Sequence, residues 1–250
     1  PSSDTVQRMG NHPVVYAFVV MKGMSLEGLS MEKKKKNYYK TAAVLIIPIA
    51  LQNLINVGIS SMDVLMLGKV GEKVLSGAAL GSQIQFILTL FLFGITSGAA
   101  VMGSQYYGKG DYQVIEKIYG LALRVSLIVT LLITCAAFFI PETLMSIFSN
   151  EAVVIEYGVT YLRWVCVSYV FMCFNMVYLN MLRSVGRVKI GTVVYFFSML
   201  TNIVMNSILI FGLLGAPKLG IAGAAIGTVC ARVVETVIIL IYDKKRIQRL

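Results

Sequence analysis

Long apolar runs separated by short polar loops dominate this chain. Six such runs stand out, at residues 41–66, 76–103, 117–140, 158–182, 190–213 and 219–242. Each reaches the roughly 20 residues that an α-helix needs to cross the hydrocarbon core of a bilayer. The strands of a membrane barrel would be about 10 residues long and would alternate polar with apolar positions. The pattern therefore predicts an all-α, polytopic membrane protein with six transmembrane helices.

Composition supports this class. Of the 250 residues, 57% are hydrophobic and 14% are charged, whereas soluble domains carry about 25% charged residues. The net charge of +10 could indicate a nucleic-acid partner, but the basic residues stand at the ends of the apolar runs. We therefore expect the lipid bilayer, and no nucleic acid, as a partner.

The distribution of Lys and Arg predicts the orientation of the helices. One side of the membrane receives most of them: Lys33, Lys34, Lys35, Lys36, Lys40, Lys109, Lys117, Arg183, Arg187, Lys189, Lys244, Lys245, Arg246 and Arg249. The opposite loops hold only Lys69, Lys73 and Lys218. The positive-inside rule then places both termini in the cytoplasm, and we expect a multi-pass protein of the cytoplasmic (cell inner) membrane.

The first 32 residues stand apart from the six runs. Residues 13–21 are apolar but too short to span a bilayer. From Met31 the chain reads Met-Glu-Lys-Lys-Lys-Lys-Asn-Tyr-Tyr, which is typical of a cytoplasmic start before a first membrane helix. We expect residues 1–32 to be a disordered extension or to lie upstream of the true start, and residues 33–250 to form a six-helix transmembrane lobe.

Asp63 is the most informative polar residue, because it lies near the end of the uncharged stretch 41–62. An ionisable group at membrane depth costs roughly 2.5 kcal/mol or more and usually marks a functional site. Asn53, Asn56 and Ser60 precede it at spacings of three, four and three, which predicts one polar face on the helix.

Pro48 lies upstream in the same helix and removes one backbone hydrogen bond, which predicts a kink. A buried acid, a polar face and a kink in one membrane helix indicate a transport site.

The fifth run repeats this pattern with Tyr195, Ser198, Asn202 and Asn206, spaced three, four and four apart. In the sixth run, Thr228 follows Gly-Ala-Ala-Ile-Gly at 223–227. Small residues allow close approach of helices in lipid, so this segment is expected to pack against another helix.

Two interpretations of these polar side chains remain open. Asp63, Asn202, Asn206 and Thr228 could supply oxygen ligands to a sodium ion or hold a proton on the acid. Alternatively, the amides and hydroxyls join helices by hydrogen bonds worth about 0.6–2 kcal/mol each. The cavity-lining candidates are Asn53, Asn56, Ser60, Tyr195, Ser198, Gln83 and Asn175.

Catalytic chemistry finds no support. The only histidine, His12, lies outside the apolar runs, and the four cysteines form no Cys-x-x-Cys pair. An intramembrane hydrolase would need a Ser/His or paired-Asp arrangement at membrane depth. We expect no enzyme activity and no cofactor other than sodium or a proton as coupling ion. Arg232 and Glu235, three apart near the end of the sixth run, are expected to neutralise each other.

Five stretches, in order along the chain, carry a family resemblance. They are Pro48 to Asp63 followed by Val-Leu-Met-Leu-Gly-Lys-Val-Gly at 64–71; Gln-Tyr-Tyr-Gly-Lys-Gly-Asp at 105–111; Leu-Arg-Ser-Val-Gly-Arg at 182–187; Asn-Ile-Val-Met-Asn at 202–206, leading to Leu-Ile-Phe-Gly at 209–212; and Leu-Gly-Ile-Ala-Gly-Ala-Ala-Ile-Gly-Thr at 219–228. On these motifs, residues 33–250 resemble the N-terminal half of a multidrug and toxic compound extrusion (MATE) transporter.

This resemblance implies a cation-coupled exporter of amphipathic, often cationic organic compounds, built from two six-helix lobes. It also implies that Asp63 takes part in proton or sodium coupling, and that Asn202 and Thr228 occupy positions of a sodium site. The chain departs from the family at Asn206, where many members carry a second aspartate.

Because the family needs about twelve helices, we expect a fragment that lacks its C-terminal lobe, or a half-size protein that pairs with a second copy. The alternative functions are a lipid-linked saccharide flippase or polysaccharide exporter of the same superfamily, or a non-transporting membrane scaffold.

Overall fold

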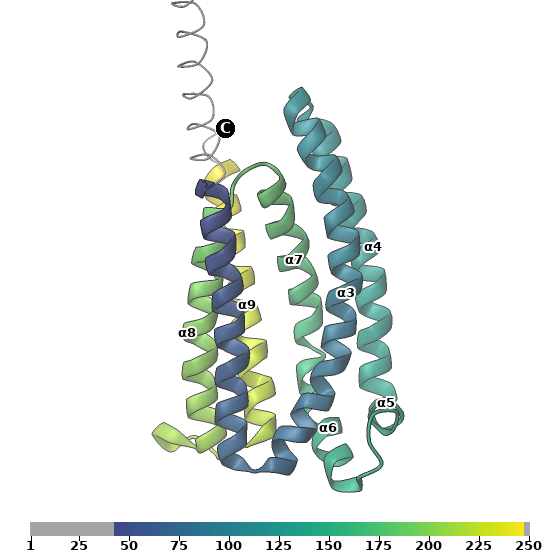
Figure 1. The fold of residues 1–250 in the computed structure, drawn as a ribbon, viewed down its shortest axis with the longest axis vertical. Helices are drawn as coiled ribbons and strands as arrows, with labels where there is room; N and C mark the ends of the chain where they lie inside the picture. The colour runs from purple at the N-terminus through teal and green to yellow at the C-terminus, as the bar shows by residue number, and fades with distance from the viewer. Residues whose placement is uncertain (1–42, 248–250) are drawn as a thin grey trace, which may run out of the picture. The chain divides into compact units, whose positions relative to one another are not determined.

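A computed structural model of the chain describes residues 43–247, and every regular secondary-structure element in this part is a helix (Figure 1). The helices are Ala43–Val70, α3 (Glu72–Lys109), α4 (Tyr112–Phe139), α5 (Pro141–Ser146), α6 (Ala152–Val165), α7 (Ser168–Ser184), α8 (Lys189–Phe211), the 3-10 turn η1 (Leu213–Gly215) and α9 (Ile221–Ile247). The predicted all-α class is confirmed. The expected extension at 1–32 lies outside the described residues. From Pro48 onward the chain forms one compact unit, and the contacts below lie within it.

Five of the described helices are long and apolar enough to cross a membrane: Ala43–Val70, α3, α4, α8 and α9. Each falls on one of the predicted spans. The predicted span 158–182 is instead a pair of helices, α6 and α7, bent by 56° where they meet. Counted as one broken span, this pair brings the number of crossings to six.

The break between α6 and α7 contains neither proline nor glycine, and two side chains there bond to the preceding turn. The Ser168 hydroxyl donates to the carbonyl of Val165 at 2.6 Å, and the Cys166 thiol donates to the carbonyl of Arg163 at 3.2 Å. Such bonds compete with the helix ladder and bend it. The bend lets α6 pack against α3 and α9 while α7 packs against α3, α4 and α9.

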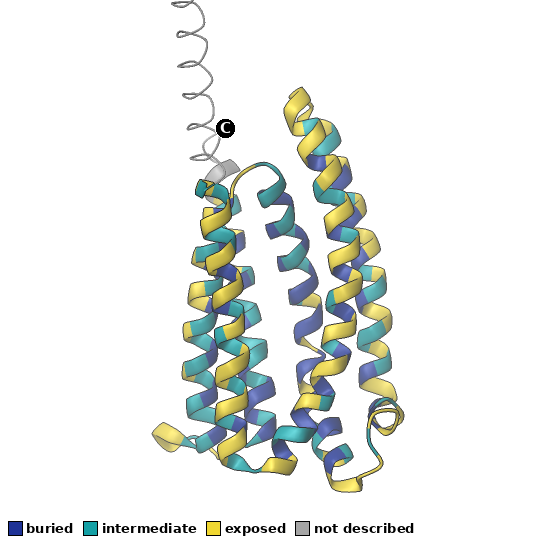
Figure 2. Ribbon diagram, in the orientation of Figure 1, coloured by how far each residue is buried: buried dark blue, intermediate teal, exposed yellow. Residues whose placement is uncertain are grey.

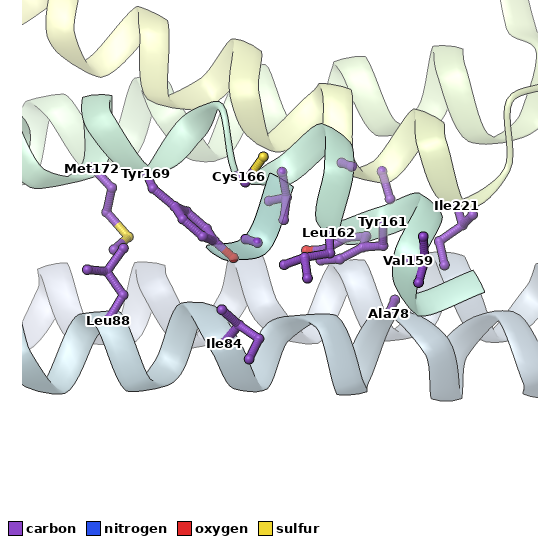
Figure 3. Close-up of a cluster of buried hydrophobic side chains, with 14 of the residues drawn as sticks. Ala78, Ile84, Leu88, Val159, Tyr161, Leu162, Cys166, Tyr169, Met172 and Ile221 are labelled. Atoms are coloured by element: carbon purple, nitrogen blue, oxygen red, sulfur yellow. The ribbon is translucent and has the colours of Figure 1, made fainter. Parts of the chain in front are cut away.

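The largest apolar core joins α3 to α6 and α7. In Figure 3, Ile84 and Leu88 of α3 face Leu162, Tyr169 and Met172 of these two helices, and all five side chains are buried. Close packing is the main source of helix association in lipid, where no hydrophobic driving force acts between helices.

Two glycines set the separation of α3 and α6. A Cβ atom at Gly77 would lie 2.5 Å from Cβ of Tyr157, and one at Gly81 would lie 2.6 Å from the ring of Tyr161. Any larger residue at either position would push the two helices apart.

The helix Ala43–Val70 packs along α8 in the parallel sense. Gln52 contacts Val188, Gly58 lies 4.0 Å from Met199, and Asp63 bonds to Asn206, so the residue numbers rise together on both helices. This register follows from the buried face of the first helix, which carries Gln52, Ile55 and Leu67.

α8 also packs closely on α9 at the small-residue run. A Cβ atom at Gly223 would lie 2.7 Å from the backbone of Leu209. The expectation that this run packs against another helix is therefore confirmed.

Apolar side chains remain exposed along the outer faces of the helices, which are yellow in Figure 2. Examples are Leu54, Phe91, Phe93 and Leu132. In a bilayer these faces meet lipid tails, for which no polar covering is needed.

Candidate cation site

Asp63 and two asparagines of α8 form one hydrogen-bonded cluster. Asn206 donates from Nδ2 to Oδ1 of Asp63 and also to Oδ1 of Asn202, the latter at 3.2 Å. Asn202 and Asn206 are buried, and Asp63 is partly exposed. Since Asp63 and Asn206 are 143 residues apart in sequence, the parallel packing of their helices creates this contact.

The fourth predicted member, Thr228, lies beside the cluster but is engaged within its own helix. Its hydroxyl donates to the carbonyl of Ala224 at 3.1 Å. Its neighbour Gly227 receives the Asn206 side chain: a Cβ atom there would lie 2.0 Å from Oδ1 of Asn206. That Oδ1 atom is buried and has no hydrogen-bond partner among the described residues.

Tyr161 of α6 also belongs to this neighbourhood, because its hydroxyl lies close to Thr228 and Ser82. Sequence reasoning missed it. An aromatic residue in an apolar helix is ordinarily part of the core, and nothing in its spacing sets Tyr161 apart.

A second polar cluster surrounds the ion pair that the sequence predicts between Arg232 and Glu235. The guanidinium lies 2.9 Å from the carboxylate, and the Glu235 side chain is 0% exposed. Two of the cavity-lining candidates hold the same carboxylate: Asn175 of α7 donates to it at 3.0 Å and Ser198 of α8 at 2.6 Å. The pair thus belongs to a network that joins α7, α8 and α9.

The polar face predicted on the helix Ala43–Val70 is divided. Asn53 and Ser60 are exposed, Asn56 is half-buried, and Asp63 turns toward α8. At 100° per residue these four positions spread over roughly 80° of the helix, so packing covers one edge of the face and leaves the other open. The open edge borders a depression of about 590 Å³ lined by Asn56, Val57, Ser60, Ser61, Val64 and Leu65.

The remaining candidates have simpler surroundings. Gln83 is exposed on α3, and Tyr195 is half-buried on α8. The helix continues through Pro48, whose carbonyl accepts a hydrogen bond from Thr192 at 3.3 Å.

Gln52 is a buried polar residue that sequence reasoning passed over. It donates to the carbonyl of Val188 at 2.9 Å and to Thr192 at 3.1 Å, and it accepts from Arg183. Gly191 leaves room for it, because a Cβ atom there would lie 2.9 Å from Nε2 of Gln52. In the sequence, Arg183 stands out only as one of the positive charges that predict the orientation of the helices. The contact between Gln52 and Arg183 could have been suspected from Gln52, a polar residue in an apolar helix one position before Asn53.

The sequence profile of the MatE family matches residues 48–208, which is more than half of the chain. The chain belongs to the MatE family. Its members are transporters rather than enzymes, which agrees with the expectation of no enzyme activity, and multidrug efflux and membrane transport are their recurrent description.

Relatives of the chain match it at low sequence identity. The MatE chain is 22% identical over 219 residues to the probable multidrug resistance protein YoeA of Bacillus subtilis, covering 87% of this chain and 47% of that protein. It is 26% identical over 202 residues to the multidrug resistance protein MdtK of Photorhabdus laumondii, covering 77% and 43%. A solved structure of the MATE multidrug transporter DinF-BH superposes with a TM-score of 0.75 at 24% identity, covering 81% of this chain and 45% of that one. The MatE chain thus spans about half the length of the relatives it matches.

The donor set of the first cluster suits a hard monovalent cation or a proton. Within residues 43–247, no group of three or more His, Cys, Asp or Glu side chains could hold a metal ion. The Asp63 carboxylate and the amide oxygens of Asn202 and Asn206 are instead oxygen ligands, the kind that hard cations prefer. Among these oxygens, Oδ1 of Asn206 accepts no hydrogen bond from the described residues.

Proposed function

We propose that this MatE chain is one lobe of a cation-coupled antiporter that exports amphipathic, cationic organic compounds. One observation carries the proposal. Asp63 receives its hydrogen bond from the neutral amide of Asn206, whereas the nearby Arg232 is paired with Glu235. A carboxylate at membrane depth needs a compensating positive charge. A proton or a sodium ion supplies that charge to Asp63.

The Asn206 amide can serve both states of the acid. With Nδ2 toward Asp63, as in this structure, it suits the ionised carboxylate. A half-turn of the amide presents Oδ1 instead, which accepts from a protonated carboxyl group or coordinates a sodium ion. Asn202 and Thr228 add further oxygens, so Asp63, Asn202, Asn206 and Thr228 form the proposed sodium or proton site.

Neutralising Asp63 alters how the first helix is held against α8. A ligand shifts an equilibrium between two packing states of the lobe by the difference in its affinity for them. The ion favours the state in which oxygen ligands lie closer to Asp63, and the organic substrate favours the other state. Alternate binding of ion and substrate then drives exchange across the membrane.

The open edge of the first helix offers a surface for the substrate. Its amides and hydroxyls at Asn53, Asn56 and Ser60 alternate with Val57 and Val64, a mixture that suits an amphipathic molecule. These residues carry no positive charge for the pyrophosphate of a lipid-linked saccharide, so a cationic or neutral substrate fits better. The description of YoeA as a probable multidrug resistance protein supports this choice.

A second lobe is needed to complete the cavity, because alternating access in transporters requires one repeat to move against another. We propose that either a C-terminal continuation or a second copy of the chain supplies it. On the Lys and Arg distribution, the protein lies in the cytoplasmic membrane with both termini in the cytoplasm.

The test is Asp63→Asn in the full-length gene product, with export of ethidium from cells or proteoliposomes as the measurement. Proton and sodium gradients are imposed separately, so that the active one identifies the coupling ion. We expect gradient-driven export to be lost while membrane insertion is retained. Asp111→Asn is the matched control, because Asp111 is an exposed helix cap whose role asparagine also fills. Wild-type export by Asp63→Asn would refute the proposal.

A further inference from the structure

Glu235 is the most completely satisfied carboxylate in the described helices. Its Oε1 accepts from Arg232 at 2.9 Å and from Ser198 at 2.6 Å, and its Oε2 accepts from Arg232 at 3.0 Å and from Asn175 at 3.0 Å. Four hydrogen bonds from three donor groups, on a side chain that is 0% exposed, are the surroundings of an ionised group. The proposed coupling mechanism makes no use of this acid.

The geometry places Arg232 between the two acids. On α8, Ser198 holds Glu235 and Asn206 holds Asp63, two helical turns or about 12 Å further along. On α9, Arg232 lies four residues after Thr228 and three before Glu235. Gly227, which contacts the Asn206 side chain beside Asp63, lies five residues or about 7.5 Å along α9 from Arg232, within the reach of a long arginine side chain.

The Arg232 side chain has donors to spare. Its bonds to Glu235 both come from Nη1, whereas a guanidinium has five N–H groups. Its side chain is 23% exposed, so the remaining groups are not enclosed by the core. A second carboxylate could therefore take them.

The charges of these three residues do not balance. With both acids ionised, Asp63, Glu235 and Arg232 carry a net charge of −1, and one proton or sodium ion brings them to zero. The other titratable groups nearby are Tyr161 of α6 and Tyr195 of α8, and Arg183 of α7 lies beyond Tyr195. The two tyrosines are neutral near pH 7, and Arg183 is engaged by Gln52.

We propose that Glu235 is a positioning residue for cation coupling: by holding Arg232, it keeps the guanidinium away from Asp63 and leaves that acid to the coupling cation. The proposal rests on the cation-coupled function above. When residue 235 is uncharged, Arg232 becomes the permanent counter-ion of Asp63, the three positions are neutral without an ion, and coupling is lost.

The test compares Glu235→Gln with the double variant Arg232→Gln/Glu235→Gln. The single variant leaves Asp63 and Arg232, with a net charge of zero, and the double variant leaves Asp63 alone, with the original charge of −1. We expect Glu235→Gln to lower gradient-driven ethidium export by about tenfold or more, and to make it insensitive to external pH or sodium. The double variant should regain both export and its dependence on the ion.

If the Arg232–Glu235 pair had only a structural role, the export activities of the two variants would rank differently. The double variant would then export no better than Glu235→Gln, and that result, obtained with normal amounts of monodisperse protein, overturns the proposal. Wild-type ion dependence in Glu235→Gln overturns it as well. Glu235→Asp, which keeps the charge, should retain coupling.

Arg232→Gln provides a second route if Glu235→Gln does not accumulate in the membrane. Glu235, buried and left without its partner, then takes up a proton, so that Asp63 again carries the single negative charge; ion-driven export should be retained, and its loss in monodisperse protein contradicts the proposal. Failure of the proposed function is distinguishable, because in that case the wild type shows no ion-driven export or Asp63→Asn retains it.

Discussion

Gly227→Ala should damage the cluster around Asp63 without touching a charged residue. A Cβ atom at this position would lie 2.0 Å from Oδ1 and 3.1 Å from Cγ of Asn206, and ordinary contact begins near 3.4 Å. Asn206 must therefore turn away or α8 must separate from α9. The first response removes the hydrogen bond to Asp63, worth about 1.5–3 kcal/mol for a charged group. The second overpacks a close helix interface, at about 1–3 kcal/mol.

Either response lowers the free energy of unfolding by about 2 kcal/mol, which corresponds to a fall in Tm of about 4–8 °C for a protein of this size. The assay is thermal unfolding of the purified protein in detergent, followed by ion-driven ethidium export in proteoliposomes. Gly98→Ala is the matched control, because Gly98 is also helical and nothing lies within 4 Å of its would-be Cβ atom. An equal Tm and equal export for the two variants would show that Asn206 is not held between Asp63 and Gly227.

Two further predictions concern polar contacts of other kinds. Gln52→Leu removes the acceptor of Arg183 and the donor to Val188. Because the guanidinium then lacks this hydrogen-bond acceptor, we expect the free energy of unfolding to fall by about 2–3 kcal/mol. Denaturant unfolding in micelles measures this, and an unchanged midpoint would contradict the role of Gln52. Lys73→Ala breaks an exposed ion pair with Glu151, 2.8 Å long; since surface pairs contribute little, Tm should not change, and a clear decrease at low and high salt alike would show that the pair matters.

The sequence determined those features that depend on one helix at a time. Hydropathy and length predict the membrane helices, because a span must satisfy its own backbone and present apolar side chains to lipid whatever its neighbours are. Helical spacing also predicts the polar stripe of α8, whose members Ser198, Asn202 and Asn206 are indeed buried together. The small-residue run of α9 likewise indicates close packing without naming the partner.

The bend between α6 and α7 could not be read from hydropathy. Residues 158–182 are predominantly apolar throughout, and the bend is accompanied by hydrogen bonds of Cys166 and Ser168 to the preceding turn. Such side chains bond in this way in many straight helices, so their presence alone does not indicate a break.

Which polar residues meet depends on the tertiary packing of the helices. Asp63 pairs with Asn206 across 143 residues of sequence and Gln52 with Arg183 across 131, because rotation about each helix axis, fixed by packing, selects the face that turns inward. The same rotation leaves Asn53 and Ser60 exposed although they share a stripe with Asp63. Packing also brings Asn175 of α7 and Ser198 of α8 to Glu235, so that this acid joins three helices and does more than neutralise Arg232. Spacing along one helix says which residues share a face, but the direction of that face depends on contacts that no single helix contains.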